Sequence, residues 1–92
     1  MIVSFKCGDT RGLFLRGKTR LWPALKAFAE RKLAMLDAAV LLSDLRSPPG
    51  NRLEILEGDR RGQHSIRINI QFRICFVWGE NGPENVEIVD YH

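Results

Sequence analysis

The sequence has few of the residues from which small metal, redox and nucleotide sites are built. Its two cysteines, Cys7 and Cys75, are far apart and form no C-x-x-C pair, and there are only two histidines. Neither a G-x-x-x-x-G-K-[ST] nor a G-x-G-x-x-G motif occurs. We therefore expect no metal site and no cofactor. Cys75 lies inside an apolar run, which predicts a buried, reduced thiol.

Long apolar segments are also missing. No stretch of about 20 apolar residues occurs that would cross a membrane, and the opening MIVSFK lacks the apolar core of a signal peptide. We expect a cytoplasmic protein with no membrane contact. The chain has 92 residues, 45% of them apolar. We therefore expect a single domain (1–92) whose apolar core is stable without disulfides or a structural metal ion.

Positive charge is absent from the last part of the chain. Residues 74–92 hold four acids and no Lys or Arg, a charge of −4, whereas residues 1–73 hold all 14 cations against seven acids, a charge of +7. A basic body suits a polyanionic partner such as nucleic acid. A basic isoelectric point is also common in small proteins, so charge alone leaves the partner open.

The apolar period in the first half of the chain is mainly helical. Residues 2–6 predict a short strand, and residues 13–16 a helical turn within a segment that is otherwise hard to place. Pro23 suits the start of a helix, and Lys32 on that helix is expected to extend to water. The apolar residues that follow Pro23 at helical spacing are Leu25, Phe28, Ala29, Leu33 and Leu36. A second short helix is predicted from Val40 to Leu45, ending before the two prolines at 48–49.

The period changes to two in the second half. Strands are predicted at 52–56, 64–70, 73–78 and 86–91, with turns at 58–62 and 79–85. The pattern puts Ile66, Ile68 and Ile70 on one face of their strand, and Ser65, Arg67 and Asn69 on the other. We predict an α+β fold: a small twisted, mainly antiparallel sheet packed on an N-terminal helical pair.

Arginines gather on the predicted face without helices. Arg67 and Arg73 fall on neighbouring strands and point the same way, so that face should be open or concave, because unpartnered charges are costly to bury. With Arg60 and Arg61 from the preceding turn they would form a floor for phosphate groups, which guanidinium binds in bidentate fashion. The alternative is that these arginines are solvated or pair across the sheet with Glu54, Glu57 and Glu87.

The last strand ends on three side chains with chemical uses. His92 can exchange protons near neutral pH, Tyr91 can bind phosphate or stack on a base, and Asp90 can orient a neighbour. An ordinary polar chain end would explain the same three residues, so this motif alone decides nothing.

The stretches LEILEGDRRGQHSIRINIQFRICFVW (53–78) and VEIVDYH (86–92) resemble the HigB group of the RelE/ParE toxin superfamily, the toxins of bacterial type II toxin–antitoxin systems. The resemblance covers the whole chain and is strongest over residues 58–75 and 86–92. It implies a small RelE-like fold. It also implies a metal-independent endoribonuclease, an mRNA interferase that cuts messages on the translating ribosome and so inhibits translation and growth.

The resemblance also implies partners and site residues. The partners are mRNA, the ribosome and a HigA-like helix-turn-helix antitoxin, through which alone operator DNA would be bound. The terminal Asp-Tyr-His maps onto Asp90, Tyr91 and His92, and the strand arginine that handles phosphate maps onto Arg73; these four form the expected catalytic set. The residues expected to contact RNA are Arg60, Arg67, Asn69 and Gln71.

Three positions depart from the family pattern. Glu54 stands where some members carry a catalytic histidine, Glu57 stands where a lysine usually precedes G-D-R, and Ile70 stands where an acid is common. Because the glutamates would face phosphate, they leave alternatives open: a ParE-like toxin directed at DNA gyrase, or a catalytically weak module that acts mainly through antitoxin binding. A general RNA-binding domain is a third alternative, although no surface aromatic pair supports it.

Overall fold

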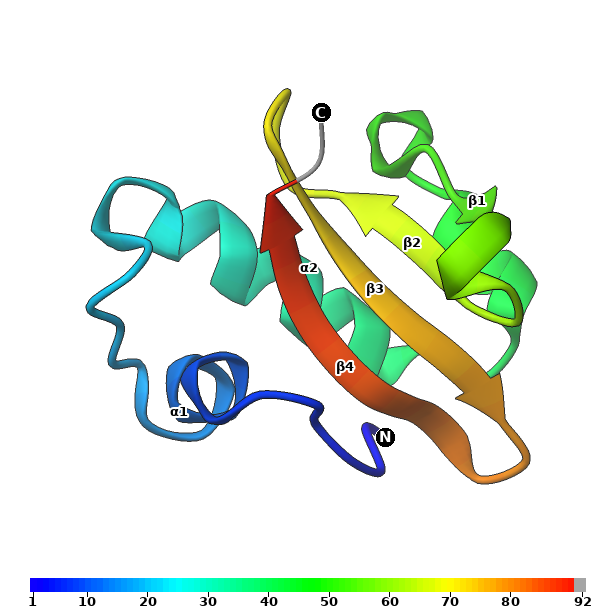
Figure 1. Ribbon diagram of the computed structural model, residues 1–92, viewed down its shortest axis with the longest axis horizontal. Coiled ribbons are helices and arrows are strands. Elements are labelled where there is room, and N and C mark those ends of the chain that lie inside the picture. Colours follow the sequence, from blue (N-terminus) through cyan, green and yellow to red (C-terminus); the bar gives the residue numbers. More distant parts are fainter. Residues whose placement is uncertain (91–92) are drawn as a thin grey trace.

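A computed structural model describes residues 1–90 of the chain, and it confirms the predicted α+β class (Figure 1). Its elements in order are α1 (Gly8–Arg16), η1 (Pro23–Leu25), α2 (Lys26–Ala38), η2 (Leu42–Arg46), η3 (Pro49–Asn51), β1 (Glu54–Ile55), η4 (Gly58–Arg60), β2 (His64–Arg67), β3 (Phe72–Gly79) and β4 (Gly82–Asp90). Elements α and η are α- and 3₁₀-helices. Within the described residues, no helix has the length and apolar character needed to cross a bilayer.

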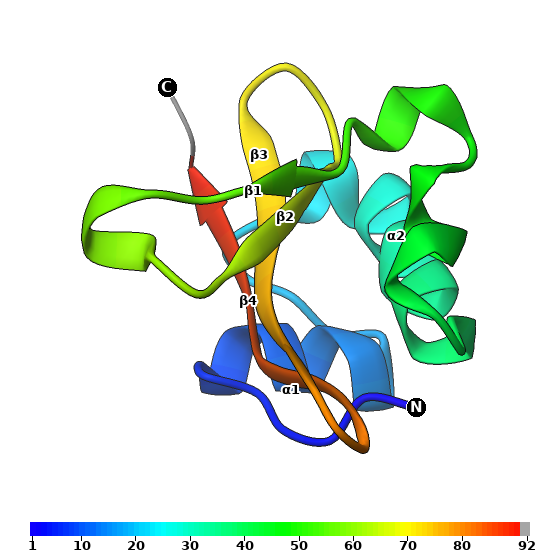
Figure 2. The same ribbon diagram turned by 90° about the vertical axis from the view of Figure 1, so that its right-hand side faces the viewer.

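The four strands form one antiparallel sheet in the order β1-β2-β3-β4. Helix α2 covers one face, and the η4 segment projects from the other side (Figure 2). The sheet therefore has one face covered by α2 and another face that no α-helix covers, called the open face below. The period-two pattern anticipated this division, since Ile66 and Ile74 pack in the core while their neighbours Arg67 and Arg73 lie opposite each other on the other face.

The core lies between α2 and the covered face. Helix α2 and the turn before it contribute a stripe at helical spacing, and β2, β3 and β4 contribute alternate residues. Phe28 was predicted on this stripe, but its side chain is 53% exposed, because it lies at the stripe's edge, where the Arg31 guanidinium covers its ring. The buried residues that meet in the core include Leu25, Ala29, Leu33, Leu36, Ile66, Ile74, Phe76, Val86 and Ile88.

Lys32 does not extend to water as expected. Its ammonium group donates to the side-chain oxygen of Asn51, and burial, with the nearby Arg31 charge, lowers the pKa of Lys32. The Asn51 amide is fully buried, and its Nδ2 donates to the carbonyls of Leu45 (3.2 Å) and Ser47 (3.3 Å). One asparagine thus joins α2 to the η2 and η3 segments, which bring the chain back to the sheet.

The predicted strand over residues 2–6 is reduced to a single parallel bridge between Phe5 and Val86. Even so, the Val3 N–H donates to the Pro83 carbonyl (2.8 Å), and the Lys6 N–H donates to the Val86 carbonyl (3.0 Å). The segment therefore occupies the free edge of β4. Edge strands expose unpaired backbone groups to other chains, and this cover removes that exposure on one side of the sheet.

Helix α1 occupies the segment where only a turn was predicted. The Cys7 sulfur caps its start by accepting from the Thr10 N–H (3.4 Å), and Gly17, at φ 65°, ends it by donating to the Leu13 carbonyl (2.9 Å). Thr10 also accepts from the N–H of Ile88 on β4 (3.1 Å). The glycines at 8, 12 and 17 obscure this helix in the sequence, because glycine is a poor helix former.

Three boundaries differ from the predicted ones. The loop predicted at 79–85 has two residues, because β4 begins at Gly82. Ile70 is 87% exposed, since β2 ends at Arg67 and the chain turns before the alternation reaches Ile70. The second helix starts at Leu42 rather than at Val40. The N–H groups of Val40 and Leu41 instead donate to the Asp44 carboxylate, and these hydrogen bonds lower the pKa of Asp44.

Replacing Asn51 with alanine should lower the free energy of unfolding by about 2–3 kcal/mol, because buried carbonyls and an ammonium group lose their partner. Urea denaturation with an unchanged m-value would measure this loss. The matched control is Gln71→Ala, which removes an exposed amide and should cost less than about 0.5 kcal/mol. Equal losses in the two variants would contradict the role given to Asn51.

Candidate functional site

The strand register sets two rows of side chains on the open face. Glu54, Ser65, Cys75 and Glu87 lie opposite one another across the four strands in one row. In the next row Arg67 lies directly opposite Arg73, and Arg73 lies opposite Val89. Like charges directly opposite each other in a sheet are destabilising unless something neutralises them. The second row therefore needs hydrogen-bond acceptors or an anion.

Arg73 obtains part of that neutralisation from the protein. It is only 7% exposed, and its Nε donates to the Ser65 hydroxyl (2.7 Å), which is itself fully buried. Its Nη2 donates to the backbone carbonyl of Arg52 (2.6 Å), and its Nη1 is 3.9 Å from a carboxylate oxygen of Glu54. The prediction that Arg73 lies on this face is correct, and the contacts show how its charge tolerates burial.

A pocket of about 430 Å³ opens beside Arg73 on this face. Three arginines and one glutamate line it, so the lining carries a net positive charge. Arg67 is half-buried, and its Nε donates to the Asn69 carbonyl (3.0 Å). The pocket's size and charge suit an anion with several oxygens, such as a phosphodiester. The lining residues are Arg52, Glu54, Arg67, Asn69, Ile70 and Arg73.

The four predicted arginines do not all converge there. The guanidinium of Arg60 lies 2.7 Å from Glu87 and also donates to the side chain of Gln63 (3.2 Å), and neither Arg60 nor Arg61 lines the pocket. Arg60 thus takes the cross-sheet ion pair that the sequence left open as an alternative. Lys6 is a second cation near the same carboxylate, at 3.9 Å.

The other predicted RNA contacts lie in the loop between β2 and β3. The Asn69 side-chain oxygen accepts from the N–H groups of Gln71 (2.9 Å) and Phe72 (2.7 Å), so it shapes the loop, while the residue also lines the pocket. The Gln71 amide donates to the Asp90 carboxylate (3.0 Å). This contact brings the end of β4 to the loop that borders the pocket.

Asp90 enters the site differently from the sequence expectation. It lies opposite Phe72, which packs against the core, whereas Val89 is the residue opposite Arg73. Asp90 therefore follows the period of the covered face and meets the site through Gln71. Tyr91 and His92, the other two residues of the expected catalytic tail, lie outside the described residues.

Sequence reasoning missed Arg52 and Ser65. Arg52 was assigned to the start of a strand, but it has left-handed backbone (φ 46°), presents its carbonyl to Arg73 and lines the pocket with its side chain. The preceding P-P-G-N signalled a turn, but not the direction in which Arg52 would leave it. Ser65 gave a partial signal, since it shares a face with Arg67.

The row next to the pocket holds the Cys75 thiol. It is fully buried, as predicted, and this burial raises the pKa of Cys75 above its usual range. Across residues 1–90, no three His, Cys, Asp or Glu side chains cluster in a way that could hold a metal ion.

Comparison with known families decides the relationship. The family model of the RelE-like toxin HigB of type II toxin–antitoxin systems matches residues 5–92. The chain belongs to this HigB-like family. Membership confirms the resemblance seen in the sequence.

Two relatives show how far the likeness extends. The chain is 60% identical over 48 residues to Toxin HigB-1 of Vibrio cholerae, an overlap of 52% of this chain and 50% of that protein. It is 43% identical over 56 residues to an uncharacterized protein of Haemophilus influenzae, an overlap of 61% and 55% respectively. The matches thus span about half the length of these curated relatives.

The two arginines of the second row should differ sharply in their effect on stability. Arg73→Ala leaves the buried Ser65 hydroxyl and the Arg52 carbonyl without their donor, and should cost about 2–4 kcal/mol of unfolding free energy. Arg67→Ala removes a half-buried side chain and should cost less than about 1 kcal/mol. Urea unfolding of this HigB-like chain and its two variants would measure the difference, and a larger loss for Arg67→Ala would contradict it.

Stability should fall at alkaline pH because of Cys75. Its folded-state pKa is raised, so above the unfolded thiol pKa of about 8.5 the unfolded state releases a proton that the folded state keeps. The unfolding free energy therefore falls as the pH rises from that value towards the folded-state pKa. Urea unfolding between pH 7 and 10 in reductant should show a steeper fall for wild type than for Cys75→Ala or Cys75→Val. Parallel curves would contradict this prediction.

Proposed function

We propose that this HigB-like chain is the toxin of a type II toxin–antitoxin system and an endoribonuclease that cuts mRNA on the translating ribosome. The observation that carries the proposal is the cationic pocket on the open face, where Arg52, Arg67 and Arg73 surround one cavity. Family membership supports the same conclusion independently. Cleavage of messages in the cytoplasm would stop translation and growth, and the antitoxin would restrain it.

The pocket suits the backbone of RNA better than a small ligand. Arg67 and Arg73 face each other across the ladder, and a phosphate between them would relieve their repulsion. Arg73 already donates to protein acceptors through its Nε and Nη2 atoms. Its proposed role is therefore to attract the phosphate with a positive charge that is held in place. Arg67 and Arg52 are the better candidates for direct contact with the phosphate oxygens, with Asn69 and Gln71 supporting the nucleotide beside the loop.

The proposed reaction uses the RNA's own 2′-hydroxyl. Its oxygen attacks the adjacent phosphorus while a base removes its proton, and the bond from phosphorus to the 5′-oxygen breaks. An acid gives a proton to that leaving oxygen, so the products are a 2′,3′-cyclic phosphate and a 5′-hydroxyl. Arginines stabilise the charge that grows on the two non-bridging oxygens. This scheme requires no metal ion.

The terminal residues supply the proposed acid. His92 is the proton donor to the leaving oxygen, Asp90 orients it, and Tyr91 hydrogen-bonds the phosphate or stacks on a base. Asp90 is anchored beside the pocket through Gln71. Arg60 is a more distant contributor to RNA binding, because it is paired with Glu87. The base is left unassigned.

A second candidate function is a catalytically weak toxin that acts mainly through its antitoxin. The observation that favours it is Glu54, whose carboxylate lines the pocket 3.9 Å from Arg73 and competes with phosphate for the arginine charge. Glu57 lies outside this pocket, at the start of η4. Of the two glutamates that depart from the family pattern, Glu54 is therefore the one placed to weaken RNA binding.

Cleavage of mRNA on translating ribosomes, mapped by primer extension of 5′ ends, tests the proposal. We expect His92→Ala to slow cleavage by about 10²–10⁴-fold, the usual contribution of an acid–base group. Arg67→Ala should slow it by at least about tenfold, whereas Glu54→Gln should strengthen RNA binding, most of all at low salt, where the carboxylate's repulsion of phosphate is least screened. Arg11→Ala, which removes an exposed cation on α1, is the matched control.

Three results would contradict the assignment. Intact cleavage in both His92→Ala and Arg67→Ala would exclude the proposed site. DNA damage signalling before any loss of translation would instead indicate a gyrase-directed toxin. No cleavage by wild type or Glu54→Gln, together with tight antitoxin binding, would favour the catalytically weak alternative.

A further inference from the structure

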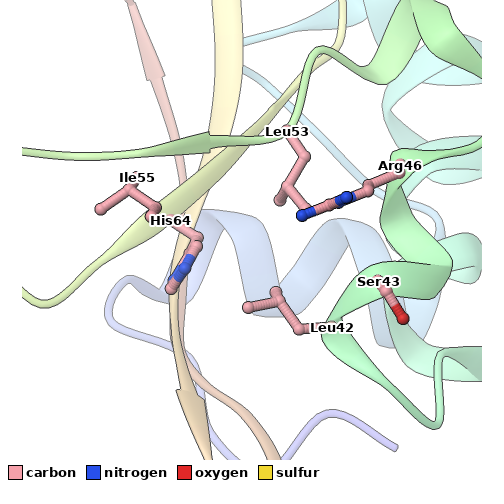
Figure 3. A pocket seen from close by; sticks show the side chains of 6 residues that line it. All are labelled: Leu42, Ser43, Arg46, Leu53, Ile55 and His64. Carbon is pink, nitrogen blue, oxygen red and sulfur yellow. The ribbon is translucent and has the colours of Figure 1, made fainter.

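A second pocket lies on the opposite side of the sheet from the cationic pocket. It has a volume of about 510 Å³ and lies between η2 and β1, with His64 of β2 at its floor (Figure 3). The two residues of β1 divide between the two pockets: Glu54 lines the cationic one, and Ile55 lines this one. We call it the η2–β1 groove; its lining is Leu42, Ser43, Arg46, Leu53, Ile55 and His64.

Apolar side chains are exposed to solvent in the groove and next to it. Ile55 is 72% exposed, and Leu41, next to the groove residue Leu42, is 60% exposed. The N-terminal segment covers the free edge of β4, whereas β1 is the opposite edge strand of the sheet. Apolar side chains gathered on an uncovered edge are typical of a protein interaction site.

The imidazole of His64 has a buried nitrogen, Nδ1, without a hydrogen-bond partner among the described residues. The ring stacks against Phe76, with ring centroids 6.1 Å apart. Buried polar atoms of native proteins nearly always have a partner. A hydrogen-bonding group that entered the groove from another molecule would satisfy it.

The charge of the groove indicates the chemistry of its occupant. Arg46 is exposed at its rim and makes no ion pair with any described residue, and no acid lines the groove. Asp44, two residues away, accepts backbone N–H groups of its own loop. The apolar lining and the single cation do not suit an RNA backbone. They suit a protein segment with an apolar side chain next to a carboxylate.

We propose that the η2–β1 groove is a docking site for the antitoxin, receiving an apolar side chain against Leu42, Leu53 and Ile55. A carboxylate of the same antitoxin segment pairs with Arg46, and a polar group of that segment bonds His64 Nδ1. This inference rests on the toxin role proposed above, because that role supplies an antitoxin. It adds the surface and the type of segment that recognise it.

The test measures the affinity of the chain for a HigA-like helix-turn-helix antitoxin, by calorimetry with both proteins purified. Ile55→Asp and Arg46→Glu should each weaken binding by at least about tenfold, as central contacts of an interface do. Arg46→Lys should restore most of the affinity. His64→Phe keeps the ring but removes Nδ1, and should weaken binding by about threefold or more.

Matched controls lie on α1, away from the groove. Leu15→Asp changes an apolar side chain that is 55% exposed, and Arg16→Glu reverses an exposed cation; both should bind the antitoxin like wild type. Thermal denaturation of every variant checks that the fold is retained. Wild-type affinity in Ile55→Asp and Arg46→Glu, or no binding of this protein to the wild-type chain, would overturn the proposal.

The same variants separate this inference from the proposed nuclease. Ile55→Asp should still cut mRNA on ribosomes, but the antitoxin should no longer inhibit it. If wild type fails to cut while Ile55→Asp still loses antitoxin binding, the nuclease proposal fails and the docking site stands. A wild-type dimer in light scattering that Ile55→Asp dissolves would overturn the docking site in favour of a second copy of the chain.

Discussion

The buried guanidinium of Arg73 is the contact on which the rest of the site depends. It joins β3 to β2 through the Ser65 hydroxyl, and to the end of η3 through the Arg52 carbonyl. Arg52 follows Asn51, whose amide is in turn hydrogen-bonded within the helical layer. A chain of polar contacts therefore runs from α2 to the open face. Because each buried member needs its partner, the position of the pocket follows from the packing of the helices.

The alternation of side chains along the strands allows a few adjacent residues to line two different surfaces. Neighbouring residues of a strand point to opposite faces. Glu54 therefore lines the cationic pocket and Ile55 the groove, and Ser65 holds Arg73 while His64 lines the groove. A shift of one residue in the β1–β2 register would exchange a carboxylate for an isoleucine beside the arginines. The cationic pocket and the apolar groove are thus tied to a single register, and neither can change its lining without changing the other.

The parts of the structure that could be predicted are those governed by local periodicity. The helix stripe and the faces of β2 and β3 follow from spacing, and so does the common face of Arg67 and Arg73. Ile70 could not be placed, because the length of β2 depends on the turn that follows it. The pairing of Arg60 with Glu87 joins residues 27 positions apart, and no local pattern encodes such a contact. Sequence likeness supplied the role expected of the tail, which periodicity could not.

The pairing of Arg60 also changes the meaning of the charge asymmetry along the chain. In the sequence, the basic body and the acidic end look like separate regions, but Glu87 of the acidic end lies against Arg60 and near Lys6 of the basic part. The Glu87 carboxylate offsets one of these two positive charges on the open face. The positive potential available to a polyanion therefore comes from the Arg52 and Arg67 side of the sheet, where Glu54 is the acid within the pocket lining. The strength of that potential depends on Glu54, because a carboxylate 3.9 Å from the Arg73 guanidinium offsets part of the positive charge that a phosphate would meet.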